Sequence, residues 1–175
     1  MSSIGIDEEQ LTEDRWEALA KAAAARRSGA AEEKSALLEL LTLQLAGAPY
    51  AIPVVRVREI VRMRSITPVP RVPSEILGVV SLRGEIVQVV DMRRRLGLSV
   101  TEPSRDSRII IVLTEDNRLA GLLVDAVTSV LRVTESVVLP APAGDTENIE
   151  GLCPRGKEFV SLISLDRVLE IGTEH

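Results

Sequence analysis

Apolar and polar positions alternate along most of the chain after residue 36, and this pattern predicts β-strands rather than long helices. Glycine, proline and acidic residues stand between the apolar runs, where turns and loops are expected. Strands are expected at 37–45, 50–52, 78–84, 85–91, 109–113 and 119–124, with single helical turns at 92–97 and 165–169. Many short strands separated by turn signals favour small β-barrels over an open sheet.

The second half of the β pattern is similar to the first half. The segment YAIPVVRVREI aligns with AGLLVDAVTSV, which places Ala51 against Gly121 at an offset of 70 positions. Gly78 matches Gly151 at an offset of 73. We therefore predict two similar sub-barrels, approximately at 37–100 and 101–172, which share an aliphatic core and between which strands can be exchanged.

Residues 1–36 form an N-terminal extension that differs in texture from the β domain at 37–172. One helical face is formed there by Trp16, Leu19, Ala20 and Ala23. Two interpretations of the extension stay open. It is either a solvated tail, partly helical or disordered, or a docking helix anchored by Trp16.

The segment PVVRVREIV at 53–61 is rich in β-branched residues. Proline suits the first position of a helix, because its φ is fixed and it has no N–H to leave unpaired. A short helix is therefore expected from Pro53, with Val54, Val57 and Val61 on one face. Either this helix is wedged between the two barrels, or part of its surface is an exposed groove for a partner helix.

The composition argues against most catalytic designs. Cys153 is the only cysteine and His175 the only histidine among 175 residues, so Cys–His and Ser–His pairs and zinc sites are not expected. The net charge of −5 and the 2 % aromatic content argue against nucleic-acid binding. We expect no metal and no cofactor. No signal segment and no apolar stretch of membrane-spanning length is evident, so a cytoplasmic protein is expected.

Few residues remain as candidates for chemistry. Asp91, Asp125 and Asp166 each follow an apolar run. Paired carboxylates could serve a hydrolase or transferase, but an aspartate in this position more often caps the next helix or turn. Arg83 ends an apolar strand beside Gly84. It is either a turn residue or a guanidinium that a rigid turn presents to a partner.

Longer strings point to a family. The block GVVSLRGEIVQVVDMRRRLG at 78–97, with YAIPVVRVREI, TPVPRVP and GLLVDAVTSVL, resembles the CheW family of chemotaxis coupling proteins over residues 37–170. The resemblance implies two five-stranded SH3-like β-barrels that share a hydrophobic core, and no enzymatic activity. It also implies an adaptor that bridges the cytoplasmic signalling tip of a chemoreceptor and the regulatory domain of a CheA-type histidine kinase, at receptor arrays beneath the inner membrane.

The resemblance also implies where partners bind. Val57, Gly78 and Arg83 match positions in or near the partner surfaces of the family, and Glu59 and Gly84 complete the candidate partner-binding set. No nucleic acid and no direct membrane insertion are expected. An alternative function is a stand-alone CheW-like regulator that binds a kinase or other effector in gliding, twitching or second-messenger control, without a receptor array.

Overall fold

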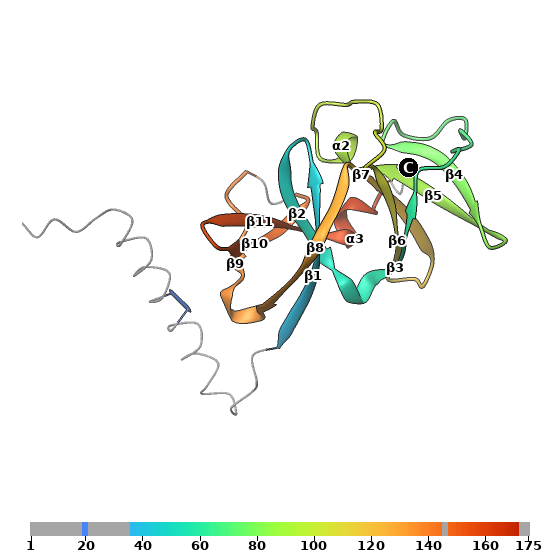
Figure 1. Cartoon of the computed structure of the whole chain (residues 1–175). Helices are drawn as coiled ribbons and strands as arrows, with labels where there is room; N and C mark the ends of the chain where they lie inside the picture. The colour runs from blue at the N-terminus through green and yellow to red at the C-terminus, as the bar shows by residue number, and fades with distance from the viewer. Residues whose placement is uncertain (1–18, 21–35, 145–146, 172–175) are drawn as a thin grey trace, which may run out of the picture.

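The computed structural model describes residues 19–20, 36–144 and 147–171 (Figure 1). This part of the chain is mainly β, as the alternating pattern predicts. Its strands are β1 (Leu37–Leu45), β2 (Ala48–Pro53), β3 (Val57–Arg62), β4 (Ile76–Leu82), β5 (Glu85–Asp91), β6 (Arg108–Leu113), β7 (Leu119–Val124), β8 (Ala126–Thr134), β9 (Leu139–Pro140), β10 (Ile149–Arg155) and β11 (Glu158–Ile163). Its short helices are η1 (Val54–Arg56), α2 (Met92–Arg95), η2 (Glu135–Val137) and α3 (Leu165–Val168). The helix expected in the N-terminal extension lies outside the described residues, apart from Leu19 and Ala20.

The strands form two sheets that lie side by side in Figure 1. The first sheet has the order β8-β1-β2-β11-β10-β9, and the second has the order β3-β6-β7-β5-β4. Neighbouring strands run antiparallel with one exception in each sheet: β2 runs parallel to β11, and β5 runs parallel to β7. The two-barrel architecture with a few short helices therefore agrees with the fold expected from the sequence.

The two sheets do not divide the chain near residue 100. The first sheet combines β1 and β2 with the strands from β8 to β11, and the second consists of β3 to β7. Each half of the chain thus lends its first hairpin to the sheet of the other half. Physically, the exchange pairs both outer edges of each hairpin, and unpaired edges are a liability. The expected boundaries at 37–100 and 101–172 are not those of the sheets.

Two glycines show that the halves are structurally equivalent. Gly78 pairs with Val89 across β4 and β5, and Gly151 pairs with Leu162 across β10 and β11. A Cβ atom on Gly78 would collide with the carbonyl oxygen of Thr67, and one on Gly151 would collide with that of Leu139. In both halves the glycine lets an extended segment pass close to the hairpin. This match confirms the internal repeat found in the sequence.

Aliphatic side chains fill three buried clusters. Each barrel has its own small core, which contains Val89 in the second sheet and Leu162 in the first. A larger cluster lies between the sheets and takes residues from both, including Met92 of α2 and Leu165 of α3. The shared core predicted from the sequence is this central cluster. The two short helices contribute to it directly, so they join the barrels.

The segment after Pro53 differs from the expected helix. Only Val54–Arg56 form a 3-10 turn, and Val57 then begins β3, which pairs with β6. β-branched side chains favour strands, and here they meet the isoleucines of β6. Val57 packs on the central core and Val61 on the core of the second barrel. Val57 and Val61 therefore serve two different cores, whereas Val55 and Ile60 of the same segment are exposed.

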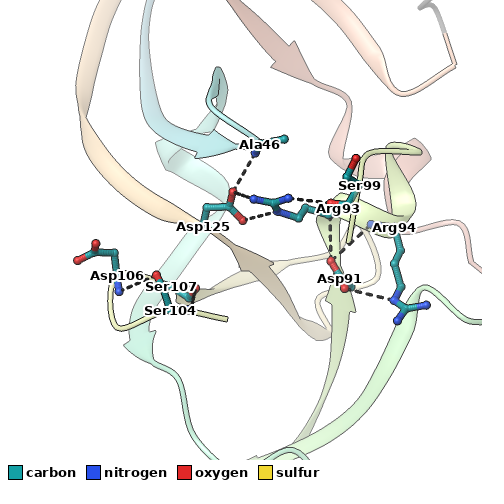
Figure 2. Close-up of polar contacts among 9 residues, drawn as sticks. All are labelled: Ala46, Asp91, Arg93, Arg94, Ser99, Ser104, Asp106, Ser107 and Asp125. Carbon is teal, nitrogen blue, oxygen red and sulfur yellow. Dashed lines mark hydrogen bonds and ion pairs between the residues drawn. The ribbon is translucent and has the colours of Figure 1, made fainter. Parts of the chain in front are cut away.

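An ion pair ties the hairpin of one sheet to the helix of the other (Figure 2). The guanidinium of Arg93 in α2 donates to both carboxylate oxygens of Asp125, at 2.8 and 2.6 Å. Asp125 also accepts from the backbone N–H of Ala46 in the β1–β2 turn, at 2.8 Å. Burial raises the pKa of the Asp125 carboxyl, but the hydrogen bonds from Arg93 and Ala46 outweigh burial and hold this pKa below its ordinary value. Such bidentate pairs are among the stronger polar contacts in proteins.

We expect Val89→Asp and Leu162→Asp to destabilise the fold strongly and for the same physical reason. Both side chains are buried, with exposed fractions of 0 % and 5 %. A carboxylate placed there would be buried without a partner, at a cost of about 3–5 kcal/mol in the free energy of unfolding. Ile86→Asp is the matched control, because Ile86 lies on the same strand as Val89 and is 69 % exposed. Denaturant titration measures all three; equal stability of Val89→Asp and wild type would contradict the register of β5.

We expect Asp125→Asn to lower the free energy of unfolding by about 2 kcal/mol at pH 7, because it removes a bidentate charged contact. The folded pKa of Asp125 is depressed, so its contribution is present above the unfolded pKa and is lost as pH falls through the folded pKa. The difference in the free energy of unfolding between Asp125→Asn and wild type should therefore become smaller below about pH 4. Asp116→Asn, which removes the exposed partner of Arg118, is the control and should change stability little. A gap that stays constant down to pH 2 would contradict this account.

Candidate partner-binding surface

The candidate surface begins at the tight turn between β4 and β5. Leu82 pairs with Glu85, so Arg83 and Gly84 alone form the loop of the hairpin. Both have a positive φ, of 52° and 83°, which is the geometry of a type I′ turn. Such turns favour Asn-Gly, because glycine and asparagine adopt this conformation readily. Gly84 fits the turn, whereas Arg83 is held there at a cost on the order of 1 kcal/mol.

The equivalent turn in the other half has a different residue at its first loop position. Between β10 and β11, Arg155 pairs with Glu158, and the first loop residue is Gly156, with a φ of 60°. Glycine thus occupies the position that Arg83 occupies in the β4–β5 turn. Turn geometry therefore does not require arginine at residue 83. The side chain must be accounted for by what it contacts.

Arg83 meets a second member of the candidate set. Its guanidinium donates to the carboxylate of Glu59 in β3 at 3.0 Å, which joins two residues 24 positions apart. The Arg83 side chain is 81 % exposed, and that of Glu59 is 21 % exposed. An ion pair this exposed contributes about 0–1 kcal/mol to stability. Its main effect is to orient an exposed guanidinium toward β3.

The other candidates support this surface without presenting polar groups. Val57 is half-buried against the central core, where β3 begins. The backbone of Thr67 passes so close to Gly78 that any side chain at residue 78 would collide with it. Gly78 also has a positive φ, and Gly84 completes the turn. The structure thus brings Glu59 and Arg83 into contact and gives Val57, Gly78 and Gly84 roles in shape.

One exposed apolar residue was missed by the sequence reasoning. Ile86 in β5 pairs with Ser81 next to the Arg83 turn and is 69 % exposed. Phe159, at the offset of 73 that relates the two halves in this region, is also exposed, at 41 %. The sequence signal that could have identified Ile86 is that an apolar residue occurs at the equivalent position of both halves. Exposed apolar side chains beside a charged group are typical of protein interfaces.

The carboxylates considered for catalysis make structural contacts instead. Asp91 caps α2 by accepting from the backbone N–H groups of Arg93 and Arg94, at 3.0 and 3.5 Å (Figure 2). Asp166 pairs with Arg56 at 3.0 Å, and Asp125 with Arg93. The capping interpretation is thus confirmed for Asp91, while the other two carboxylates pair with arginines.

The thiol of Cys153 is poorly suited to act as a nucleophile. Cys153 is buried and unpaired, and burial raises the pKa of its thiol to about 11, which disfavours the reactive thiolate. No group of three or more potential ligand residues that could hold a metal ion occurs among residues 19–20, 36–144 and 147–171. Within the same residues, no helix is long and apolar enough to span a membrane.

Comparison with known proteins shows the family of the chain. Residues 39–172 match the family model described as CheW-like domain. The chain is 34 % identical over 134 residues to a chemotaxis protein CheW of Rhizobium meliloti, covering 74 % of this chain and 86 % of that protein. It is also 34 % identical over 136 residues to a chemotaxis protein CheW of Bacillus subtilis, covering 75 % and 86 %.

A solved structure supports the same relationship. The scaffolding protein TtCheW from Thermoanaerobacter tengcongensis superposes with a TM-score of 0.74 at 34 % identity, covering 78 % of this chain and 95 % of that one. The family model begins within β1 and extends past the last described helix, α3. The chain therefore belongs to the CheW-like family.

Proposed function

We propose that this chain is a non-catalytic adaptor that couples chemoreceptors to a CheA-type histidine kinase in a chemosensory signalling array. Membership of a family whose relatives are named chemotaxis proteins and a scaffolding protein supports the adaptor role. The observation that carries the proposal is Arg83, a guanidinium held outward by a strained turn and an ion pair with Glu59. Its partners would be the kinase regulatory domain and the receptor signalling tip, at receptor arrays beneath the inner membrane.

The physical design of the surface suits this role. A two-residue hairpin loop has little freedom, so the backbone that carries the guanidinium loses little conformational entropy on binding. Arginine donates in a planar fork, which suits bidentate contacts with a carboxylate or with backbone carbonyls. Ile86, exposed beside the turn, offers apolar area to the same partner. Arginine with an apolar neighbour is a combination often found at energetic centres of interfaces.

We expect Arg83→Glu to abolish coupling while the protein still folds. The residue is exposed, so loss of its ion pair and repulsion from Glu59 should lower the free energy of unfolding by only about 1 kcal/mol. Loss of an interface arginine commonly costs about 2 kcal/mol of binding, or roughly thirtyfold in Kd. The measurements are a thermal melt and kinase phosphorylation in a reconstituted mixture of receptor, kinase and adaptor. Normal kinase activation at limiting adaptor would contradict the role proposed for Arg83.

Two further variants separate the ion pair from the partner contact. Arg83→Asn removes the guanidinium but suits the left-handed turn, so it should melt at or above the wild-type temperature and still fail to couple. The double variant Glu59→Arg with Arg83→Glu restores an ion pair of reversed direction. It should not restore coupling. Recovery in the double variant would show that the pair itself is required, and that Arg83 does not contact the partner.

A further inference from the structure

Positive charge gathers along one strand of a chain whose net charge is negative. Arg58 and Arg62 are exposed on β3, and Arg64, two positions after the end of the strand, is also exposed. We call these three residues the β3 basic strip. The net charge of the whole chain is −5, so the strip stands out against an acidic background.

The strip does not contribute ion pairs to the fold. Within residues 19–20, 36–144 and 147–171, the side chains of the strip make neither a salt bridge nor a hydrogen bond. Other arginines in the same residues, such as Arg118 and Arg132, do pair with carboxylates. The three positive charges of the strip are therefore available to a partner.

One of these arginines stands in an unfavourable place for folding. Arg62 lies directly opposite Arg108 in the pairing of β3 with β6. Like charges directly opposite each other across a sheet are destabilising. The Arg108 guanidinium donates to the backbone carbonyls of Arg105 and Ser107, so the chain already provides contacts for that charge. Arg62 has no such contacts. Its repulsion from Arg108 lowers the stability of the fold, and carboxylates of a partner could offset this repulsion.

An apolar side chain lies in the middle of the strip. Ile60, between Arg58 and Arg62 along β3, is 42 % exposed. β3 is also an edge of the second sheet, with β6 as its one neighbour there. An exposed apolar residue flanked by charges has the layout of a small interface, with an apolar centre and a charged rim. Charges on an edge strand can also prevent edge-to-edge aggregation, but that role is served by any charge and does not call for an exposed isoleucine.

We propose that the outer face of β3 docks an acidic face of the partner protein, with carboxylates against Arg58, Arg62 and Arg64 around an apolar contact on Ile60. The proposal rests on the adaptor function and assigns the charge of the surface that the adaptor recognises. Glu59, which holds Arg83, lies on the same strand but alternates with Ile60 and Arg62, so the strip lies on the other face of β3 from the Glu59–Arg83 pair, along the same sheet edge. Charge complementarity of this kind sets partner choice and speeds association.

The test uses the full chain and the purified partners of the same bacterium: the kinase regulatory domain and the receptor signalling tip. The variant is Arg58→Glu with Arg62→Glu and Arg64→Glu. The control carries Arg118→Glu, Arg132→Glu and Arg155→Glu, which make the same change in net charge at arginines that already have ion partners. Calorimetry at low and high salt measures Kd for each protein.

We expect the strip variant to bind at least one partner on the order of tenfold or more weakly at low salt, while the control stays close to wild type. Wild-type affinity should fall as salt rises, and the strip variant should lose most of this dependence. The strip variant should melt no lower than wild type, because Glu at residue 62 would face Arg108. If it does not fold, the neutral variant Arg58→Gln with Arg62→Gln and Arg64→Gln replaces it, with a smaller loss expected.

Three outcomes would overturn the proposal, and they are distinguishable. Equal weakening of both partner affinities in strip and control variants would show a general charge effect. Unchanged partner binding, together with strip-dependent binding to vesicles of phosphatidylglycerol, would assign the strip to a membrane. In both cases the adaptor function would stand. Failure of the wild-type chain to bind either protein would instead remove the adaptor function and this proposal together.

Discussion

Neither half of the chain can complete a sheet by itself, and the rest of the architecture depends on this constraint. The β1–β2 hairpin finds its outer neighbours in β8 and β11, and the β6–β7 hairpin finds them in β3 and β5. The two parallel pairs, β2 with β11 and β5 with β7, are the seams of this exchange. Because the hairpins cross between halves, the central core receives side chains from both sheets and the barrels cannot separate.

The same exchange determines where the candidate surface lies. β3 follows the hairpin of the first sheet but pairs within the second, so the chain turns at η1 and presents β3 along an edge. The β4–β5 hairpin lies at the opposite end of the sheet order, and the Arg83–Glu59 ion pair connects its turn to β3. Asp125 connects α2 to the β1–β2 turn, because it pairs with Arg93 of α2 and accepts from the backbone N–H of Ala46 in the turn. The surface is therefore carried by a rigid frame rather than by a mobile loop.

Local patterns predicted most of the strands, because alternation and turn residues act over a few positions. The expected hairpin at Arg83-Gly84 and the helical turn capped by Asp91 follow from such short-range chemistry. Alternation says which face of a strand is buried but not which strand lies beside it, so the sequence could not show which hairpins cross the expected boundary near residue 100. Pro53 and the spacing of the valines after it suited a helix as well as a strand, and pairing with β6 decided between them.

The contacts of the candidate surface could be predicted from the sequence only in part, for the same reason. Arg83 could be recognised from its turn and its family match, but contact with Glu59 depends on how β3 and the β4–β5 hairpin come together. The arginines of β3 can be counted in the sequence. Their lack of ion partners is visible only once the positions of the surrounding carboxylates are known.

The hairpin exchange also has a consequence for the order of folding. The second sheet uses the continuous stretch 57–124, whereas the first must bring Tyr50 in β2 beside Ser161 in β11. Closing so long a loop costs more entropy than local pairing does, so we expect the second sheet to form first. Until β11 arrives, the early β1–β2 hairpin has an open edge. In that interval a second copy of the chain can supply the missing strand, which makes the parallel seam the natural place for domain swapping.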